Sequence, residues 1–154
     1  MLNQLVVFSL DTQLYALPLA SVERVVRMVE VTPLPKAPDI VLGVIDVQGN
    51  IIPVMSMRKR FGLPEPETSL SSLLMVTYTD TRSVALVVNS VTGVIERMAE
   101  EITATETIVQ GAQYVEGITK LEDGILFIHN VDRFLSRKED QQLSWLLAQA
   151  AGRE

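Results

Sequence analysis

The sequence contains no cysteine, which excludes disulfides and thiolate zinc sites and fits a reducing cytoplasm. Its single histidine, His129, has no second histidine or cysteine with which to share a metal. It also lacks an orienting partner for acid–base chemistry, so we expect His129 to be structural or exposed. We therefore expect no metal site, no cofactor and no catalytic centre.

Aromatic residues and positive charge are also scarce. Aromatic residues make up 5% of the 154-residue chain, and the formal net charge is −6. Such a chain lacks the positive field and the stacking surfaces of a nucleic-acid binder, so nucleic acid is not an expected partner. No apolar run approaches the roughly 20 residues of a membrane span, and no basic region precedes an apolar core at the N-terminus. We therefore expect neither membrane insertion nor a signal peptide.

The charged residues form no motif that carries chemistry. The pairs Glu100-Glu101 and Glu122-Asp123 are adjacent in sequence, which usually means solvation rather than a shared proton. The eight glycines are spread singly and mark turns, so no loop that would cradle a phosphate is indicated. One basic run, Arg58-Lys59-Arg60, indicates either a solvated helix face or a contact with an acidic partner surface.

Strand patterns dominate a composition that is 47% hydrophobic. The stretch Gly43–Val54 predicts a tight β-hairpin that turns at Gly49-Asn50, and Pro53 places one side of its return strand on an edge or at a bulge. Three more hairpins are predicted at 5–10 with 14–19, 73–78 with 83–89, and 114–121 with 124–129. Short helices are predicted at 56–61 and 131–135, and an amphipathic C-terminal helix at 138–151.

An internal repeat organises these elements. The pattern of residues 16–26 recurs at 85–95, and the hairpin that begins at Gly43 recurs at Gly117. Phe61 and Phe134 occupy matching places after the two hairpins. Because each half supplies about five short strands, closure into a small barrel is the economical way to avoid open edges.

The predicted fold is therefore mostly β, with two five-stranded SH3/OB-like β-barrel subdomains related by this repeat. We expect one domain over 1–154, with halves at roughly 14–68 and 69–136. The N-terminal strand and the C-terminal helix at 138–151 are expected to pack across the two halves.

The order of these motifs resembles the chemotaxis coupling-protein (CheW-like) family from about Gln4 to Leu147. The segments that carry the resemblance are Val7-Phe8-Ser9-Leu10, Tyr15-Ala16-Leu17-Pro18, Val22-Glu23-Arg24-Val25-Val26, Pro35-x-x-Pro38, and Gly43-Val44-Ile45-Asp46-Val47-Gln48-Gly49-Asn50-Ile51-Ile52-Pro53-Val54. The last segment is distinctive, because the family reads close to G-V-x-N-L-R-G-x-x-x-P-V there.

The resemblance implies a non-catalytic adaptor rather than an enzyme. Family members bridge the cytoplasmic tips of transmembrane chemoreceptors and the regulatory domain of a CheA-like histidine kinase. The implied location is cytoplasmic, with recruitment to membrane receptor arrays. Strand edges and the groove between the barrels make the contacts. The positions that match the partner-binding motif are Val22, Arg24, Val25, Gly43, Gln48, Val91 and Val94. Core packing is the alternative role of the valines.

The chain departs from the family pattern at three of these motif positions. Arg24 stands where the family usually has Glu, Gln48 where it has Arg, and Asp46 where it has Asn. The first two changes are mutually sensible, because two facing arginines would repel each other whereas Arg24 and Gln48 can form a hydrogen bond. They predict an unchanged fold with altered recognition of a standard receptor tip.

Three other interpretations remain open from the sequence. One is a divergent CheW-like adaptor of a non-flagellar kinase pathway, such as pilus motility. Another is an uncharacterised enzyme or small-ligand-binding β-barrel, which would need a polar pocket with convergent titratable groups. The third is a nucleic-acid-binding barrel, which the acidic balance disfavours.

Overall fold

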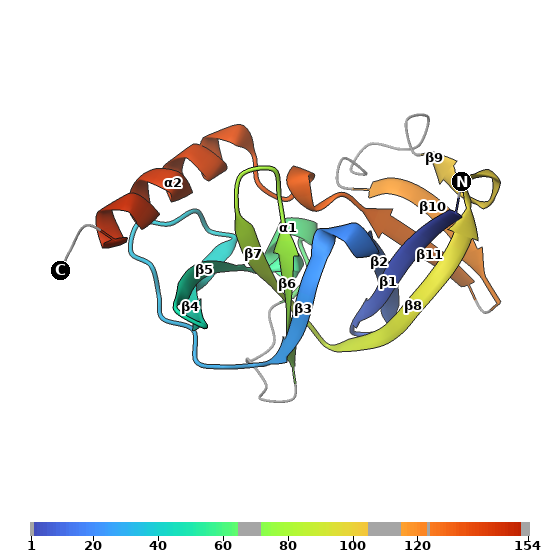
Figure 1. Ribbon diagram of the computed structural model, residues 1–154, viewed down its shortest axis with the longest axis horizontal. Helices are drawn as coiled ribbons and strands as arrows, with labels where there is room; N and C mark the ends of the chain where they lie inside the picture. Colours follow the sequence, from blue (N-terminus) through green and yellow to red (C-terminus); the bar gives the residue numbers. More distant parts are fainter. Residues whose placement is uncertain (1, 65–71, 105–114, 123, 152–154) are drawn as a thin grey trace.

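The computed structural model describes residues 2–64, 72–104, 115–122 and 124–151. Its strands form two sheets that lie side by side, with a C-terminal helix outside one of them (Figure 1). The five-stranded sheet has the order β3-β6-β7-β5-β4, and the six-stranded sheet has the order β8-β1-β2-β11-β10-β9. The mostly β prediction is thus confirmed, with one more strand than expected in one half.

The five-stranded sheet is made of consecutive strands. They are β3 (Val22–Arg27), β4 (Val41–Val47), β5 (Asn50–Met55), β6 (Leu73–Tyr78) and β7 (Ser83–Val88). The six-stranded sheet combines both ends of the strand order: β1 (Leu2–Leu10), β2 (Gln13–Pro18), β8 (Ser90–Met98), β9 (Thr103–Ala104), β10 (Val115–Leu121) and β11 (Gly124–His129). The helices are η1 (Leu19–Ser21), α1 (Met57–Phe61), η2 (Ala99–Glu101), η3 (Val131–Arg133) and α2 (Arg137–Ala151). We call the parts built on these sheets the first half and the second half.

The hydrogen-bonded sheets divide the chain differently from the sequence repeat. The N-terminal hairpin β1–β2 belongs to the second half, because β1 pairs with β8 and β2 pairs in parallel with β11. The first half is continuous in sequence from β3 to β7. The halves predicted at 14–68 and 69–136 therefore describe the repeat in the sequence, whereas strand pairing places residues 2–18 beside residues 90–98 and 124–129.

The repeat itself is visible in the pairing of the strands. In the first half β5 pairs in parallel with β7, with Val54 opposite Ala85. In the second half β11 pairs in parallel with β2, with Ile128 opposite Ala16. These are the positions that the sequence repeat equates. Each half also shows an irregularity just before the repeated glycine, Gly43 or Gly117.

A short bridge joins the edge strands of each half. In the first half, Thr32 in the segment after β3 forms this bridge with Val44 of β4. The amide of Thr32 donates to the carbonyl of Val44 at 3.0 Å, and the amide of Val44 donates to the carbonyl of Thr32 at 2.8 Å. In the second half β9 follows β8 and pairs with β10 in the corresponding place. Both sheets thus close on themselves, which removes the open edges that a short-stranded sheet would present.

The turn of the β4–β5 hairpin lies one residue earlier than predicted. Val47 pairs with Asn50, so the turn residues are Gln48 and Gly49 rather than Gly49 and Asn50. Both have positive φ, 52° and 88°, as a two-residue hairpin turn of this kind requires. The carboxylate of Asp46 accepts a hydrogen bond from the amide of Gly49 at 2.7 Å and so stabilises the turn.

The buried apolar residues of the described ranges form three hydrophobic clusters. One lies inside the first half and includes Val54 and Leu74, and another lies inside the second half and includes Leu5 and Leu126. The largest cluster draws residues from both sheets and from α2, and we call it the shared core. Because the shared core joins the halves, they form one packed unit.

The C-terminal helix α2 begins one residue before the predicted range. The amide of Ser136 donates to Glu139 Oε1 at 2.8 Å, and Ser136 Oγ accepts from the amide of Glu139 at 3.1 Å, which is a capping box. Leu143 is fully buried in the shared core, and Leu146 is buried as well. Figure 1 shows α2 running along the first half, with its C-terminal end pointing away from the second half.

Candidate partner-binding surface

Val25 and Val94 occupy equivalent places in the repeat, on strands β3 and β8. Their side chains are 39% and 51% exposed, which is high for valine. Val25 lies opposite Met75 and Val94 lies opposite Val6, and both partners belong to the shared core. Because opposed residues of antiparallel strands point to the same face, the two valines stand on the faces that flank the junction of the halves.

Val22 and Val91 are also equivalent in the repeat, but they are half-buried. Both pack against the shared core. They therefore contribute packing as well as surface, so the alternative role for the valines applies to this pair more than to Val25 and Val94.

Arg24 and Gln48 line one hollow of about 260 Å³, which we call the first hollow. It lies between the β4–β5 turn and the β6–β7 turn. The Arg24 guanidinium is 3.7 Å from Glu23 Oε1 and is partly exposed. Among the described residues no hydrogen bond joins Arg24 to Gln48, so the structure brings the two together without the predicted bond. A hydrogen bond from Tyr78 to Glu23 raises the pKa of the tyrosine.

Gly43 is buried, so it cannot contact a partner directly, and its effect on the surface is through the path of the backbone. Its φ is +154°, and a Cβ there would lie 2.2 Å from the carbonyl oxygen of Thr32 and 2.8 Å from Val31 Cγ1. The glycine is required because the closing bridge passes directly over it. Gly117 is the equivalent, where a Cβ would lie 2.7 Å from Ile102 Cγ2.

His129 is 2% exposed and packs among aromatic rings at the junction of the halves. Its ring centroid is 5.2 Å from that of Tyr15, 5.0 Å from that of Phe61 and 5.7 Å from that of Phe134. Burial raises the pKa of Tyr15 in the same cluster. Within the described ranges no three metal-ligating side chains gather, at His129 or elsewhere. The structure thus places His129 in a packing role.

The basic run on α1 binds acidic residues of this same chain. Arg58 forms two hydrogen bonds with Asp11, at 2.5 and 2.8 Å, and a third with Asn89 at 2.9 Å. These bonds from Arg58 lower the pKa of Asp11. Arg60 pairs with Glu139 at 2.6 Å. Neither sequence interpretation of the run holds for the two arginines, because they fasten the β1–β2 turn and α2 to α1.

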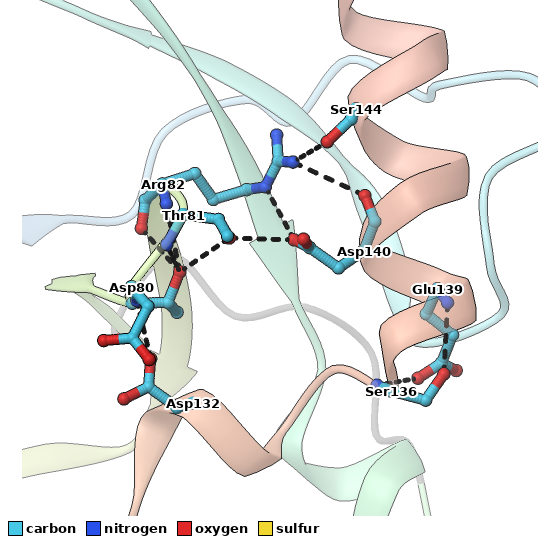
Figure 2. Close-up of polar contacts among 9 residues, drawn as sticks. Asp80, Thr81, Arg82, Asp132, Ser136, Glu139, Asp140 and Ser144 are labelled. Carbon is cyan, nitrogen blue, oxygen red and sulfur yellow. Dashed lines mark hydrogen bonds and ion pairs between the residues drawn. The ribbon is translucent and has the colours of Figure 1, made fainter.

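A polar network between α2 and the β6–β7 turn escaped the sequence analysis (Figure 2). Arg82 Nε donates to Asp140 Oδ1 at 3.0 Å, and its Nη2 donates to Ser144 Oγ. Thr81 Oγ1 also donates to Asp140 at 3.1 Å. The one local signal was the Ser136-to-Glu139 capping pattern, which fixes the start of the helix but does not identify its partners.

Within the described parts of the chain, no helix is long and apolar enough to cross a membrane.

Comparison with known proteins identifies the family and the relatives that this chain resembles. Residues 4–139 match the CheW-like domain family. The chain is 26% identical over 148 residues to the chemotaxis protein CheW of Treponema pallidum, covering 92% of this chain and 86% of that protein. It is 28% identical over 145 residues to the chemotaxis protein CheW of Bacillus subtilis, covering 90% of each. The crystal structure of the scaffolding protein TtCheW from Thermoanaerobacter tengcongensis matches with a TM-score of 0.82 and 30% identity, over 90% of this chain and 96% of that one.

Proposed function

The chain belongs to the CheW-like family, and from that membership we propose that it is a scaffold which couples chemoreceptors to a histidine kinase in chemotaxis signalling. The chemotaxis proteins that it resembles and the solved scaffolding protein are matched over nine-tenths of this chain. The expectation that the chain is not an enzyme agrees with membership of a scaffolding family.

The observation that carries this proposal is the pair of equivalent exposed valines, Val25 and Val94. An exposed β-branched side chain on a closed sheet gains little from solvent, whereas it supplies apolar contact area to a docked partner. The repeat presents the same chemistry twice, once in each half, so one molecule can hold two proteins at the same time.

We further propose which partners these faces bind. One is the regulatory domain of a CheA-like kinase, and the other is the cytoplasmic tip of a chemoreceptor. The protein then works in the cytoplasm at the membrane receptor array. Val22 and Val91 lie next to the two exposed faces, Arg24 and Gln48 contribute through the first hollow, and Gly43 maintains strand β4 beneath the closing bridge.

The test is a binding titration of each partner with Val25→Asp and Val94→Asp. A charge in place of a contacting valine removes about 2 kcal/mol or more of binding free energy, so the dissociation constant should rise about 30-fold for at least one partner. Val29→Asp is the matched control, because Val29 is 46% exposed and lies outside both strands. If both variants bind kinase and receptor as tightly as the parent does, the valine faces are not the docking surfaces.

A further inference from the structure

The second half contains a hollow that is the counterpart of the first hollow. It measures about 580 Å³ and lies between the β1–β2 turn and the β10–β11 turn. Leu121 and Ile125 line it where Val47 and Ile51 line the first hollow, and the repeat equates these pairs. We call it the second hollow.

Helix α2 borders the first hollow. Leu147 of α2 lines that hollow directly. Asp140, two turns earlier on α2, accepts the hydrogen bonds from Arg82 and Thr81 that attach the helix to the β6–β7 turn (Figure 2). The first hollow is thus completed by an amphipathic helix that supplies a leucine to its wall and a carboxylate two turns earlier.

The second hollow also has an exposed isoleucine and an arginine in its lining, and none of the residues that line it belongs to α2. Ile125 is 53% exposed, close to the 55% of Ile51. Arg97 lies at the rim and donates to the backbone carbonyls of Glu96 and Lys120, at 2.9 and 3.4 Å. Over the described residues no carboxylate pairs with Arg97. Glu122 also lines the hollow, so its wall combines three apolar side chains with one cation and one carboxylate that do not pair with each other.

We propose that the second hollow is the docking site for an amphipathic α-helix of a partner protein, which lies there as α2 lies on the first half. A leucine of that helix enters beside Ile125 and Leu121, and a carboxylate on the same helix pairs with Arg97. The repeat supports this occupant, because the equivalent hollow of the same molecule is completed by such a helix. A second copy of the chain does not supply it, because Leu143 fixes α2 in its own shared core.

The experiment uses the full chain with isotope-labelled isoleucine and leucine methyl groups and a synthetic peptide with the sequence of residues 136–151. We expect the peptide to shift the methyl signals of Ile125, Leu121 and Leu14 with a dissociation constant below about 1 mM. In the chain, Ile125→Glu should weaken binding about tenfold, and Ile51→Glu, its matched control in the first hollow, should leave binding unchanged. Arg97→Gln should weaken binding and reduce its dependence on salt.

Three results would overturn the proposal. They are the absence of methyl shifts at the second hollow, equal losses from Ile125→Glu and Ile51→Glu, and equal binding of a control peptide whose leucines are replaced by serine. Peptide binding at the second hollow is measured separately from the scaffold function, because the scaffold function is tested by the valine substitutions on β3 and β8. Ile125→Glu is expected to leave those valine faces intact, so either proposal can fail while the other stands.

Discussion

Replacing Gly43 by alanine tests how the first half is closed. The new Cβ would lie 2.2 Å from the carbonyl oxygen of Thr32 and 2.8 Å from its carbonyl carbon, which is backbone and cannot rotate away. The strand must therefore move, and that overpacking costs about 1–3 kcal/mol. The move also breaks the two hydrogen bonds between Thr32 and Val44, each with a net contribution of about 1 kcal/mol. The expected loss is about 3–5 kcal/mol, a large share of the roughly 5–15 kcal/mol that stabilises a domain.

Equilibrium unfolding in urea, followed by far-ultraviolet circular dichroism, measures this loss. With a slope of about 2 kcal/mol per molar urea, the midpoint should fall by about 2 M. Gly49→Ala is the matched control: its φ is also positive but nothing lies within 4 Å, so about 1 kcal/mol is expected. Gly117→Ala should fall between them, because Ile102 can move its side chain. A Gly43→Ala protein within 1 kcal/mol of the parent, with the amides of Thr32 and Val44 still protected from hydrogen exchange, would refute the steric argument.

Three further outcomes are expected. Although burial raises the pKa of Glu139, the bonds from Ser136 and Arg60 hold it below its usual 4.5, so this stabilisation is present above about pH 4.5 and is lost as the pH falls further. When the pH is lowered from about 5 to 3, the free energy of unfolding measured in urea should therefore fall less for Arg60→Met than for the parent. If the free energy of unfolding depends on pH in the same way in both proteins, the pairing of Arg60 with Glu139 is contradicted. Leu143→Ala should destabilise the protein by about 2–5 kcal/mol in the same assay, because its side chain is fully buried; a loss below 1 kcal/mol would mean that α2 is only loosely attached. The double variant Arg24→Glu with Gln48→Arg should bind a standard receptor tip more tightly than the parent in a pull-down, whereas Gln48→Arg alone should not; equal binding by parent and double variant would remove these positions as the cause of altered recognition.

The sequence predicts what depends on local pattern. Hairpins follow from alternating apolar residues and turn residues, and the repeat at 16–26 and 85–95 follows from matching letters. The predicted position of the β4–β5 turn was wrong by one residue, because Gln48 adopts a positive φ that its residue type does not favour. The hydrogen bond from the Gly49 amide to Asp46 supports that conformation. That support depends on a side-chain bond which a turn pattern alone does not indicate.

Long-range partners could not be predicted in the same way. Arg58 meets Asp11 across 47 positions of sequence, and Arg60 meets Glu139 across 79. The amino-acid sequence of a basic run is the same whether its side chains contact solvent, another protein or a distant turn of their own chain. The valines are a second example. Val22 is half-buried against the shared core and Val25 is exposed, and this difference in burial depends on tertiary packing that the residue type does not reveal.

The placement of the N-terminal hairpin in the second half determines the order in which the protein can mature on the ribosome. Residues 2–18 are synthesised well before the strands that flank them in the sheet, β8 (Ser90–Met98) and β11 (Gly124–His129). The strands of the first half pair only with one another, so that sheet can form while the hairpin waits with its apolar side uncovered. Such non-local pairing slows folding and exposes nascent chains to misassembly. The β1–β2 hairpin is thus the part of this fold whose apolar residues wait longest for their partner strands.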